Sequence, residues 1–198
     1  MAATSARARG RPRDPAIDRA ILDAALRLLA EQGYDGMSLE AVAGAAGVGK
    51  TTIYRRYSGK RELVVAAISS IAASLTPPVD SGDARRDLRA FVRQALGVMR
   101  RGGLAYQVMG TLLVKERSEP ELMELFRSAV LLPRMQIGGG IVSRGVERGE
   151  IRPDVTIDVV IQLIGGAFFA RHLVGKPDDD AWLDAVFDTL WRGISTEA

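Results

Sequence analysis

The stretch SLEAVAGAAGVGKTTIYRRYSGKREL, residues 38–63, decides the fold of this chain. Its middle part fits the GxxxxGK[ST] pattern of a phosphate-binding loop, with Gly44, Gly49, Lys50 and Thr51 at the required positions. Such a loop needs a buried strand before it and a helix that begins at the lysine, so that backbone amides surround the phosphates. The residues that precede Gly44 instead have apolar side chains at helical spacing. The missing strand argues against a nucleotide site.

The same residues predict a helix, a tight turn and a second helix. The first helix is capped by Ser38 and has one apolar face, made of Leu39, Val42, Ala43 and Ala46. Gly47 allows the left-handed corner, and Ile53 is the inward anchor of the second helix. The side chains expected to point outward are Lys50, Thr51, Thr52, Tyr54, Arg55 and Arg56. Hydroxyls and cations of this kind bind phosphate oxygens and guanine edges in the major groove.

Apolar periodicity predicts helices along the whole chain and no convincing strand, so the expected fold class is all-α. One helix runs from Pro15 to Glu31, with Asp14 as its N-cap, and ends at Gln32 and Gly33. The other predicted helices cover residues 50–57, 63–75, 88–99, 104–115, 119–149, 155–174 and 178–194. Pro133 and the run Gly138–Gly140 interrupt the long segment. The glycines require either a kink or very close packing on a neighbour, and the sequence leaves both open.

Positive charge is concentrated at the N-terminus. Residues 1–60 contain ten Lys or Arg and six Asp or Glu, whereas the other residues contain seventeen and eighteen. Four arginines, Arg7, Arg9, Arg11 and Arg13, alternate with residues that include Gly10 and Pro12, so this arm cannot pack as a helix. A basic arm suits a polyphosphate partner. The alternative is a solvated tail without a function.

Composition excludes several classes of site. The chain has no Cys and one His, which excludes disulfides and thiolate metal sites and argues against any metal or cofactor. The first residues lack the apolar stretch of a signal peptide, and no run approaches the roughly 18 apolar residues of a membrane span. We therefore expect a cytoplasmic protein.

Residues 38–63 resemble the DNA-binding domain of the TetR family of transcriptional regulators. The resemblance extends to the GRPR arm, to the EQGYDGMS exit of the first helix and, more loosely, to RGEIRPD at residues 148–154. It implies a basic arm over residues 1–14, a helix-turn-helix domain over 15–60, a connecting helix over 60–76 and a helical regulatory and dimerisation domain over 77–198.

The resemblance also implies a function. The protein is expected to be a homodimeric repressor, not an enzyme, that binds a palindromic operator in the bacterial nucleoid and is released by a small-molecule effector. The alternative is a nucleotide-binding helical enzyme that uses the loop from Gly44 to Thr51. A repressor and an activator are not distinguished, and neither the operator nor the effector is predicted.

Roles of individual residues follow from the same resemblance. The phosphate-contacting positions are Ser38, Thr52, Tyr54 and Lys60, the base-reading positions are Lys50, Thr51 and Arg55, and Arg56 fits either role. Arg11 and Arg13 of the arm are further expected contacts. Gly49 stands where the family more often has a polar residue, and the pair of arginines at 55 and 56 is unusually basic, so a base preference cannot be transferred.

The C-terminal half contributes two further sets of candidate residues. The last two helices are richer in apolar residues than one inward stripe requires, so we expect a partner. The resemblance implies a four-helix interface between two copies, with Gly165, Gly166, Phe169, Trp182, Phe187 and Trp191 in it. The expected effector pocket is lined by Met99, Tyr106, Met109, Phe126, Met135, Phe168, Phe169 and His172. Core packing is the alternative for all of them.

Overall fold

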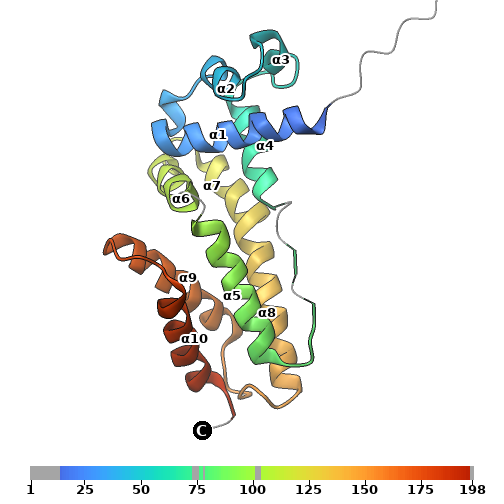
Figure 1. Ribbon diagram of the computed structural model, residues 1–198, viewed down its shortest axis with the longest axis vertical. Coiled ribbons are helices and arrows are strands. Elements are labelled where there is room, and N and C mark those ends of the chain that lie inside the picture. The colour runs from blue at the N-terminus through green and yellow to red at the C-terminus, as the bar shows by residue number, and fades with distance from the viewer. Residues whose placement is uncertain (1–13, 73–75, 78, 101–103, 197–198) are drawn as a thin grey trace, which may run out of the picture.

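The computed structural model is a bundle of helices (Figure 1). It describes residues 14–72, 76–77, 79–100 and 104–196, and of these only the backbone at residues 72, 95, 96, 98–100, 104 and 105. The helices are α1 (Pro15–Gly36), α2 (Leu39–Ala45), α3 (Lys50–Tyr54), α4 (Lys60–Ala72), α5 (Ala84–Arg100), α6 (Leu104–Lys115), α7 (Pro120–Phe126), η1 (Arg127–Leu131, a π-helical turn), α8 (Leu132–Glu147), α9 (Ile157–Leu173) and α10 (Asp180–Ile194). In the described residues the only extended pairing is the isolated bridge between Ile151 and Ser195. The all-α prediction is confirmed.

The predicted boundaries of α1 agree with its backbone. The carboxylate of Asp14 accepts a hydrogen bond from the amide of Ala16 at 2.9 Å and caps the helix. Gly33 has φ +71°, which breaks the helical backbone at the predicted end, and one further turn runs to Gly36. In Figure 1, α1 lies across the top of the bundle, with α2 and α3 above it.

The glycine run in α8 is a site of close packing. The backbone of α8 continues without a kink from Leu132 to Glu147. A Cβ atom at Gly138 would lie 2.6 Å from Cδ1 of Ile161 and 2.9 Å from Cε1 of Phe91. Any side chain at this position would therefore have to push the Ile161 and Phe91 side chains aside, so the glycine allows the close approach of α8 to α5 and α9.

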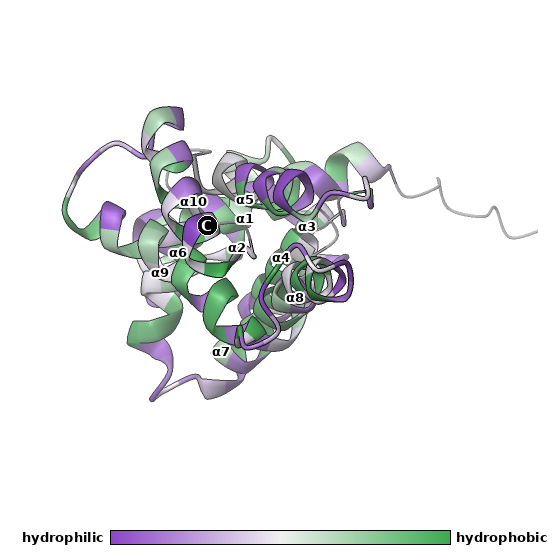
Figure 2. Cartoon of the chain, turned by 90° about the horizontal axis from the view of Figure 1, so that it is seen from below, coloured by the Kyte–Doolittle hydropathy of each residue, from purple (hydrophilic) through white to green (hydrophobic). Residues whose placement is uncertain are grey.

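The buried side chains form two cores, and long helices carry both hydrophobic and hydrophilic segments, as expected for amphipathic helices (Figure 2). The first core joins α1 to α4 with residues of α6, α7 and η1, among them Leu112, Phe126 and Val130. The second core joins α5, α8, α9 and α10, together with Tyr106 of α6. Because α6 and α7 share a close-packed core with α1 and α4, a shift of α6 or α7 must displace the N-terminal helices.

Candidate nucleic-acid interface

The turn between α2 and α3 has the predicted corner. Gly47 has φ +67°, and the amide of Val48 donates to the carbonyl of Ala43 at 2.9 Å. Val48 is half-buried against the first core, and Gly49 is the N-cap residue of α3. The segment before the glycines is the helix α2, where a phosphate-binding loop requires a strand. The nucleotide-binding alternative is therefore not supported.

The outer face of α3 presents cations and hydroxyls to solvent. Ile53 is completely buried and fixes the helix to the first core. Lys50, Thr51, Tyr54 and Arg55 are exposed, and Thr52 is half-buried. Arg55 forms no ion pair or hydrogen bond with any residue that the structure describes, so its guanidinium group keeps all its donors for a partner.

Ser38 holds the N-terminus of α2. Its Oγ accepts a hydrogen bond from the amide of Ala41 at 3.1 Å, as an N-cap residue does. The residue is exposed, so its hydroxyl proton stays available for a phosphate oxygen. This geometry agrees with the phosphate-contacting role that we predict for Ser38.

Tyr54 has an internal partner on α2. Its hydroxyl donates to Oε1 of Glu40 at 2.5 Å. This hydrogen bond raises the pKa of Tyr54 above its ordinary value and lowers the pKa of Glu40. A phosphate group that accepts a hydrogen bond from the Tyr54 hydroxyl must displace Glu40. The expected phosphate contact therefore competes with a contact already made.

Arg56 corrects one of our predictions. We expected it on the outward face of the helix, but its side chain is 7% exposed and its Nε lies 2.6 Å from Oδ1 of Asp18 on α1. Its Nη1 also donates to the carbonyl of Thr52 at 3.4 Å. Arg56 follows Ile53 by three residues and therefore lies on the same, inward side. It is a positioning residue that ties the end of α3 to α1.

Lys60 lies at the junction of three helices. Its Nζ donates to the carbonyl of Asp35 at 3.2 Å and lies 4.8 Å from the centre of the Tyr34 ring. The carboxylate of Asp35 pairs with Lys115 of α6, and this hydrogen bond, before any other cause, lowers the pKa of Asp35. The start of α4 and the end of α6 thus meet at the end of α1. The expected contacts Arg11 and Arg13 lie outside the described residues.

Both halves of the chain are similar to known proteins. Residues 21–67 match the family model described as bacterial regulatory proteins, tetR family, and residues 78–190 match the tetracyclin repressor-like C-terminal domain. The chain is 33% identical to the DNA-binding transcriptional repressor TetR of Mycobacteroides abscessus over 174 residues, which cover 86% of this chain and 90% of that protein. The chain belongs to the TetR family.

Other members of the family are similar over almost the whole chain. An uncharacterised HTH-type transcriptional regulator of Bacillus subtilis, YdeS, is 30% identical over 94% of this chain and 93% of its own length. The crystal structure of the TetR family transcription regulator SCO0332 has a TM-score of 0.62 and 29% identity, and covers 89% of this chain and 97% of that one. The protein is therefore a DNA-binding transcriptional regulator with an N-terminal helix-turn-helix.

The residues expected to line an effector pocket fall into two groups in this TetR-family regulator. Tyr106, Phe168, Phe169 and His172 meet where α6 contacts α9: the Tyr106 and His172 rings stack at 4.2 Å, and the Tyr106 hydroxyl donates to the Phe168 carbonyl at 3.3 Å. Burial raises the pKa of Tyr106 to about 12. Met109 and Phe126 pack instead in the first core, and Met135 packs against the second. The side chain of Met99 lies outside the described part of the chain.

The residues expected in the dimer interface do not all lie on one surface. Phe187 and Trp191 are 1% and 9% exposed and fill the second core, so the prediction that they form an outer face is corrected. They are buried because α10 packs its aromatic side against α5, where Arg89 and Arg85 lie over the two rings. Phe169 is half-buried against the same core.

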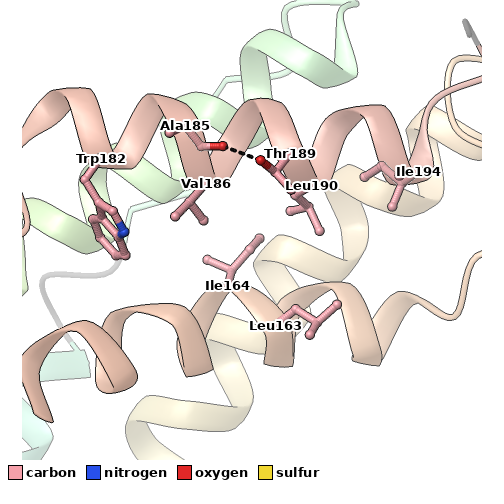
Figure 3. Close-up of a pocket in the computed structure, with 9 residues that line it drawn as sticks. Leu163, Ile164, Trp182, Ala185, Val186, Thr189, Leu190 and Ile194 are labelled. Atoms are coloured by element: carbon pink, nitrogen blue, oxygen red, sulfur yellow. Dashed lines mark hydrogen bonds between the residues drawn. The ribbon is translucent and has the colours of Figure 1, made fainter. Parts of the chain in front are cut away.

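An apolar groove lies between α9 and α10 (Figure 3). Gly165 and Gly166 are exposed, and a Cβ atom at either would meet nothing within 4 Å. The groove encloses about 560 Å³ and is lined by Leu163, Ile164, Trp182, Ala185, Val186, Thr189, Leu190, Gly193 and Ile194. Of the expected interface residues, only Trp182 is among them.

Sequence reasoning did not find Asp18 or Glu40. Asp18 and Glu40 bind Arg56 and Tyr54 from other helices, and no local pattern marks such a pair. The spacing from Ile53 to Arg56 was a usable signal for the inward arginine.

Among the helices of the described residues, none combines the length and the apolar character that spanning a bilayer requires.

Proposed function

We propose that this regulator is a repressor that binds a palindromic operator as a homodimer and leaves it when a small molecule binds the C-terminal domain. In this proposal residues 1–14 are a basic arm, 15–60 the DNA-binding domain, 60–76 the connecting helix and 77–198 the regulatory and dimerisation domain. The protein acts where bacterial DNA lies, in the cytoplasm.

The outer face of α3 carries the proposal. It combines Arg55, which has no partner in the described part of the chain, with the exposed Lys50 and Thr51 on a helix whose inward side is fixed by Ile53 and Arg56. A helix of this kind reads base edges by hydrogen bonds from its cations while neighbouring hydroxyls bind phosphates. We assign base contacts to Lys50, Thr51 and Arg55, and phosphate contacts to Ser38, Thr52, Tyr54 and Lys60.

The apolar surface of α9 and α10 supports the dimer. The exposed residues Val159, Leu163, Gly166, Ala170 and Leu173 follow one another at helical spacing and form a stripe along α9. The stripe borders the groove through Leu163, which is 59% exposed. A second copy related by two-fold symmetry can place its own α9 stripe against this surface, and the small residues at 166 and 170 let the backbones approach.

The shared core supports release by an effector. Because α6 and α7 pack against α1 and α4 in the first core, a molecule that moves α6 also moves the base of the DNA-binding domain. The pair between Lys115 and Asp35 joins the same elements at the surface. In the dimer this changes the separation of the two α3 helices, which must match about one turn of DNA, roughly 34 Å.

Selection of DNA from a random pool by the purified full-length protein tests the function. We expect enrichment of one palindromic sequence, whose affinity falls steeply as salt rises because phosphate contacts release counterions. Scrambling one half-site should weaken binding strongly. Absence of enrichment, or binding that does not depend on the second half-site, would overturn the proposal.

A further inference from the structure

A carboxylate lies beside the outer face of α3. Glu40 is the second residue of α2 and is half-buried, and its Oε1 accepts a hydrogen bond from the Tyr54 hydroxyl at 2.5 Å. Tyr54 and Lys50 are four residues apart on α3, so both lie on one side of that helix. Glu40 thus borders a side of α3 whose residues are proposed to contact DNA.

The negative charge of Glu40 is present at neutral pH. The hydrogen bond from Tyr54 is the main cause that lowers the pKa of Glu40, and the positive charge of Lys50 lowers this pKa further. In the described part of the chain, no Lys or Arg forms an ion pair with the carboxylate. The surface that is proposed to meet phosphates and base edges therefore contains an anion that no ion pair neutralises.

A carboxylate on such a surface is selective, because an ionised carboxylate can only accept hydrogen bonds. Phosphate oxygens, the O6 and N7 atoms of guanine and the O4 atom of thymine are also acceptors, so they repel it. The donors in the major groove are N4 of cytosine and N6 of adenine, and adenine presents the acceptor N7 beside its N6. Cytosine is therefore the base that suits a carboxylate best.

We propose that Glu40 is a specificity-determining residue that accepts a hydrogen bond from N4 of one cytosine in each half-site. The inference rests on the proposed function, since it requires α3 to lie in the major groove, where residues near its N-terminal end contact base edges. Glu40 belongs to α2 but lies beside Tyr54 and Lys50 of α3. Guanine or thymine at the same position leaves the negative charge without a donor and is thereby disfavoured.

The contact also gives Glu40 a partner when DNA binds. The Tyr54 hydroxyl has one proton, which either Glu40 or a phosphate oxygen can accept in a hydrogen bond. A phosphate that accepts it leaves the half-buried carboxylate unsatisfied, which is unfavourable. The amino group of a cytosine satisfies the carboxylate again. The phosphate contact of Tyr54 and the base contact of Glu40 therefore support each other only on the matching sequence.

Selection of DNA from a random pool, followed by titration of single-base variants of the selected operator, tests the contact. The full-length protein should select cytosine at one position of each half-site that depends on Glu40, and guanine at that position should weaken binding about tenfold. In Glu40→Gln this penalty should fall below about twofold. Adenine should become acceptable there, because glutamine can pair with both N6 and N7 of adenine. If Glu40→Gln changes no cytosine preference, the inference is overturned.

Two further variants separate a base contact from indirect effects. Glu31→Gln removes one negative charge from an exposed position on α1 of the same domain, so it should keep the cytosine preference. Tyr54→Phe removes the hydroxyl that Glu40 binds but leaves the carboxylate, so it should weaken all sequences and keep the preference. A preference lost in Glu31→Gln would assign the effect to net charge, and one lost in Tyr54→Phe would mean that Glu40 acts only by holding Tyr54. Either result overturns the base contact.

The stability of α2 is not confused with the base contact in this design. Glu40 lies in the first turn of α2, where a negative charge favours the helix, so Glu40→Gln can lower the melting temperature. A loss of stability weakens all sequences alike and does not change which base is preferred. Absence of any enriched sequence overturns the proposed function together with this inference. Enrichment of a palindrome in which no base depends on Glu40 leaves the proposed function in place and overturns the inference alone.

Discussion

Two neighbouring arginines at the C-terminal end of α3 have different roles because their side chains point in different directions. Arg55 is exposed and has no partner among the residues that the structure describes, whereas Arg56 lies against α1 and pairs with Asp18 at 2.6 Å. A free guanidinium group can read a base, because its donors are unused. A buried and paired one can only hold the helix in place.

We expect substitutions of the two arginines to differ in their effect on the DNA-sequence specificity of binding. Arg55→Ala should relax preference at one base pair in each half-site at a cost of about 1 to 3 kcal/mol. Arg56→Ala should weaken all sequences alike and lower the free energy of unfolding by about 1.5 to 3 kcal/mol, because Asp18 loses a charged hydrogen bond. Binding to a library of operator variants and thermal unfolding measure both effects.

Residues that we propose as phosphate contacts provide the control. Tyr54→Phe and Lys60→Ala should weaken all operators alike without the loss of stability of Arg56→Ala. Tyr54→Phe should weaken operator binding less than removal of a hydroxyl without an internal partner would, since the Tyr54 hydroxyl already donates its hydrogen bond to Glu40. If relative affinities across operator variants do not change in Arg55→Ala, the base-reading role is wrong.

Side-chain roles could be predicted from the sequence where the helix alone determines them. The inward Ile53 and the exposed Lys50, Thr51 and Arg55 follow from the spacing of one apolar residue. The partners Asp18 and Glu40 come from α1 and α2, and their contacts depend on how three helices cross. Such contacts are properties of packing, which a local pattern does not contain.

At the scale of the helix, Ser38 has two functions that can be tested separately. It caps α2 through its Oγ, and its hydroxyl is proposed to donate to a phosphate. Ser38→Ala removes both and should lower the free energy of unfolding by about 1 kcal/mol. Ser38→Asp keeps the cap, since aspartate is as good an N-cap residue, but places a negative charge beside the phosphate.

We therefore expect Ser38→Asp to be as stable as the natural protein and to bind the operator more weakly than Ser38→Ala does. Thermal unfolding and operator titration measure the two properties. Wild-type operator affinity in Ser38→Asp would remove Ser38 from the phosphate contacts.

The arm is the second element whose role can be measured. Deletion of residues 1–13 removes four arginines. If two to four of them neutralise phosphates, the slope of log affinity against log salt should become shallower by about 2 to 4 units, while the melting temperature is unchanged. A full-length variant with the same arginines replaced by glutamine is the control for chain length. A slope equal to that of the intact protein would leave the arm without a role in binding.

Most helices could be predicted because caps and stops are local. The Asp14 cap, the break at Gly33 and the span of α6 agree with the expected residues. Which face of α10 is buried within the protomer could not be predicted, because its aromatic residues fit a core and an interface equally well. Packing against Arg85 and Arg89 of α5 decides that Phe187 and Trp191 are buried.

At the scale of the whole molecule, the dimer is proposed to form along the exposed stripe of α9. A leucine at Gly166 meets no atom of its own protomer within reach of its Cβ, so the protomer should fold normally. It would meet the partner, where overpacking costs about 1 to 3 kcal/mol at each of two symmetric sites. We expect Gly166→Leu to sediment as a monomer at micromolar concentration and to lose most operator affinity.

Gly165→Leu is the matched control. Gly165 is equally exposed and equally open, but it lies on the stripe that contains Asp158 and Gln162. This variant should remain a dimer and bind the operator. If Gly165→Leu were monomeric and Gly166→Leu dimeric, the interface would lie on the face of α9 that contains Gly165.

The pair between Arg56 and Asp18 has a consequence for engineering. Gly49 is the N-cap residue of α3, and the pair of Arg56 with Asp18 fixes the other end of the helix. The two ends of the segment 50–55 are therefore held by residues other than its outward side chains. We expect these outward residues to be exchangeable with those of a relative, provided that Ile53, Gly49 and Arg56 are kept. If the proposed effector releases the operator, such chimaeras would recognise new promoters yet answer to the same chemical signal, and would serve as modular sensors in synthetic gene circuits.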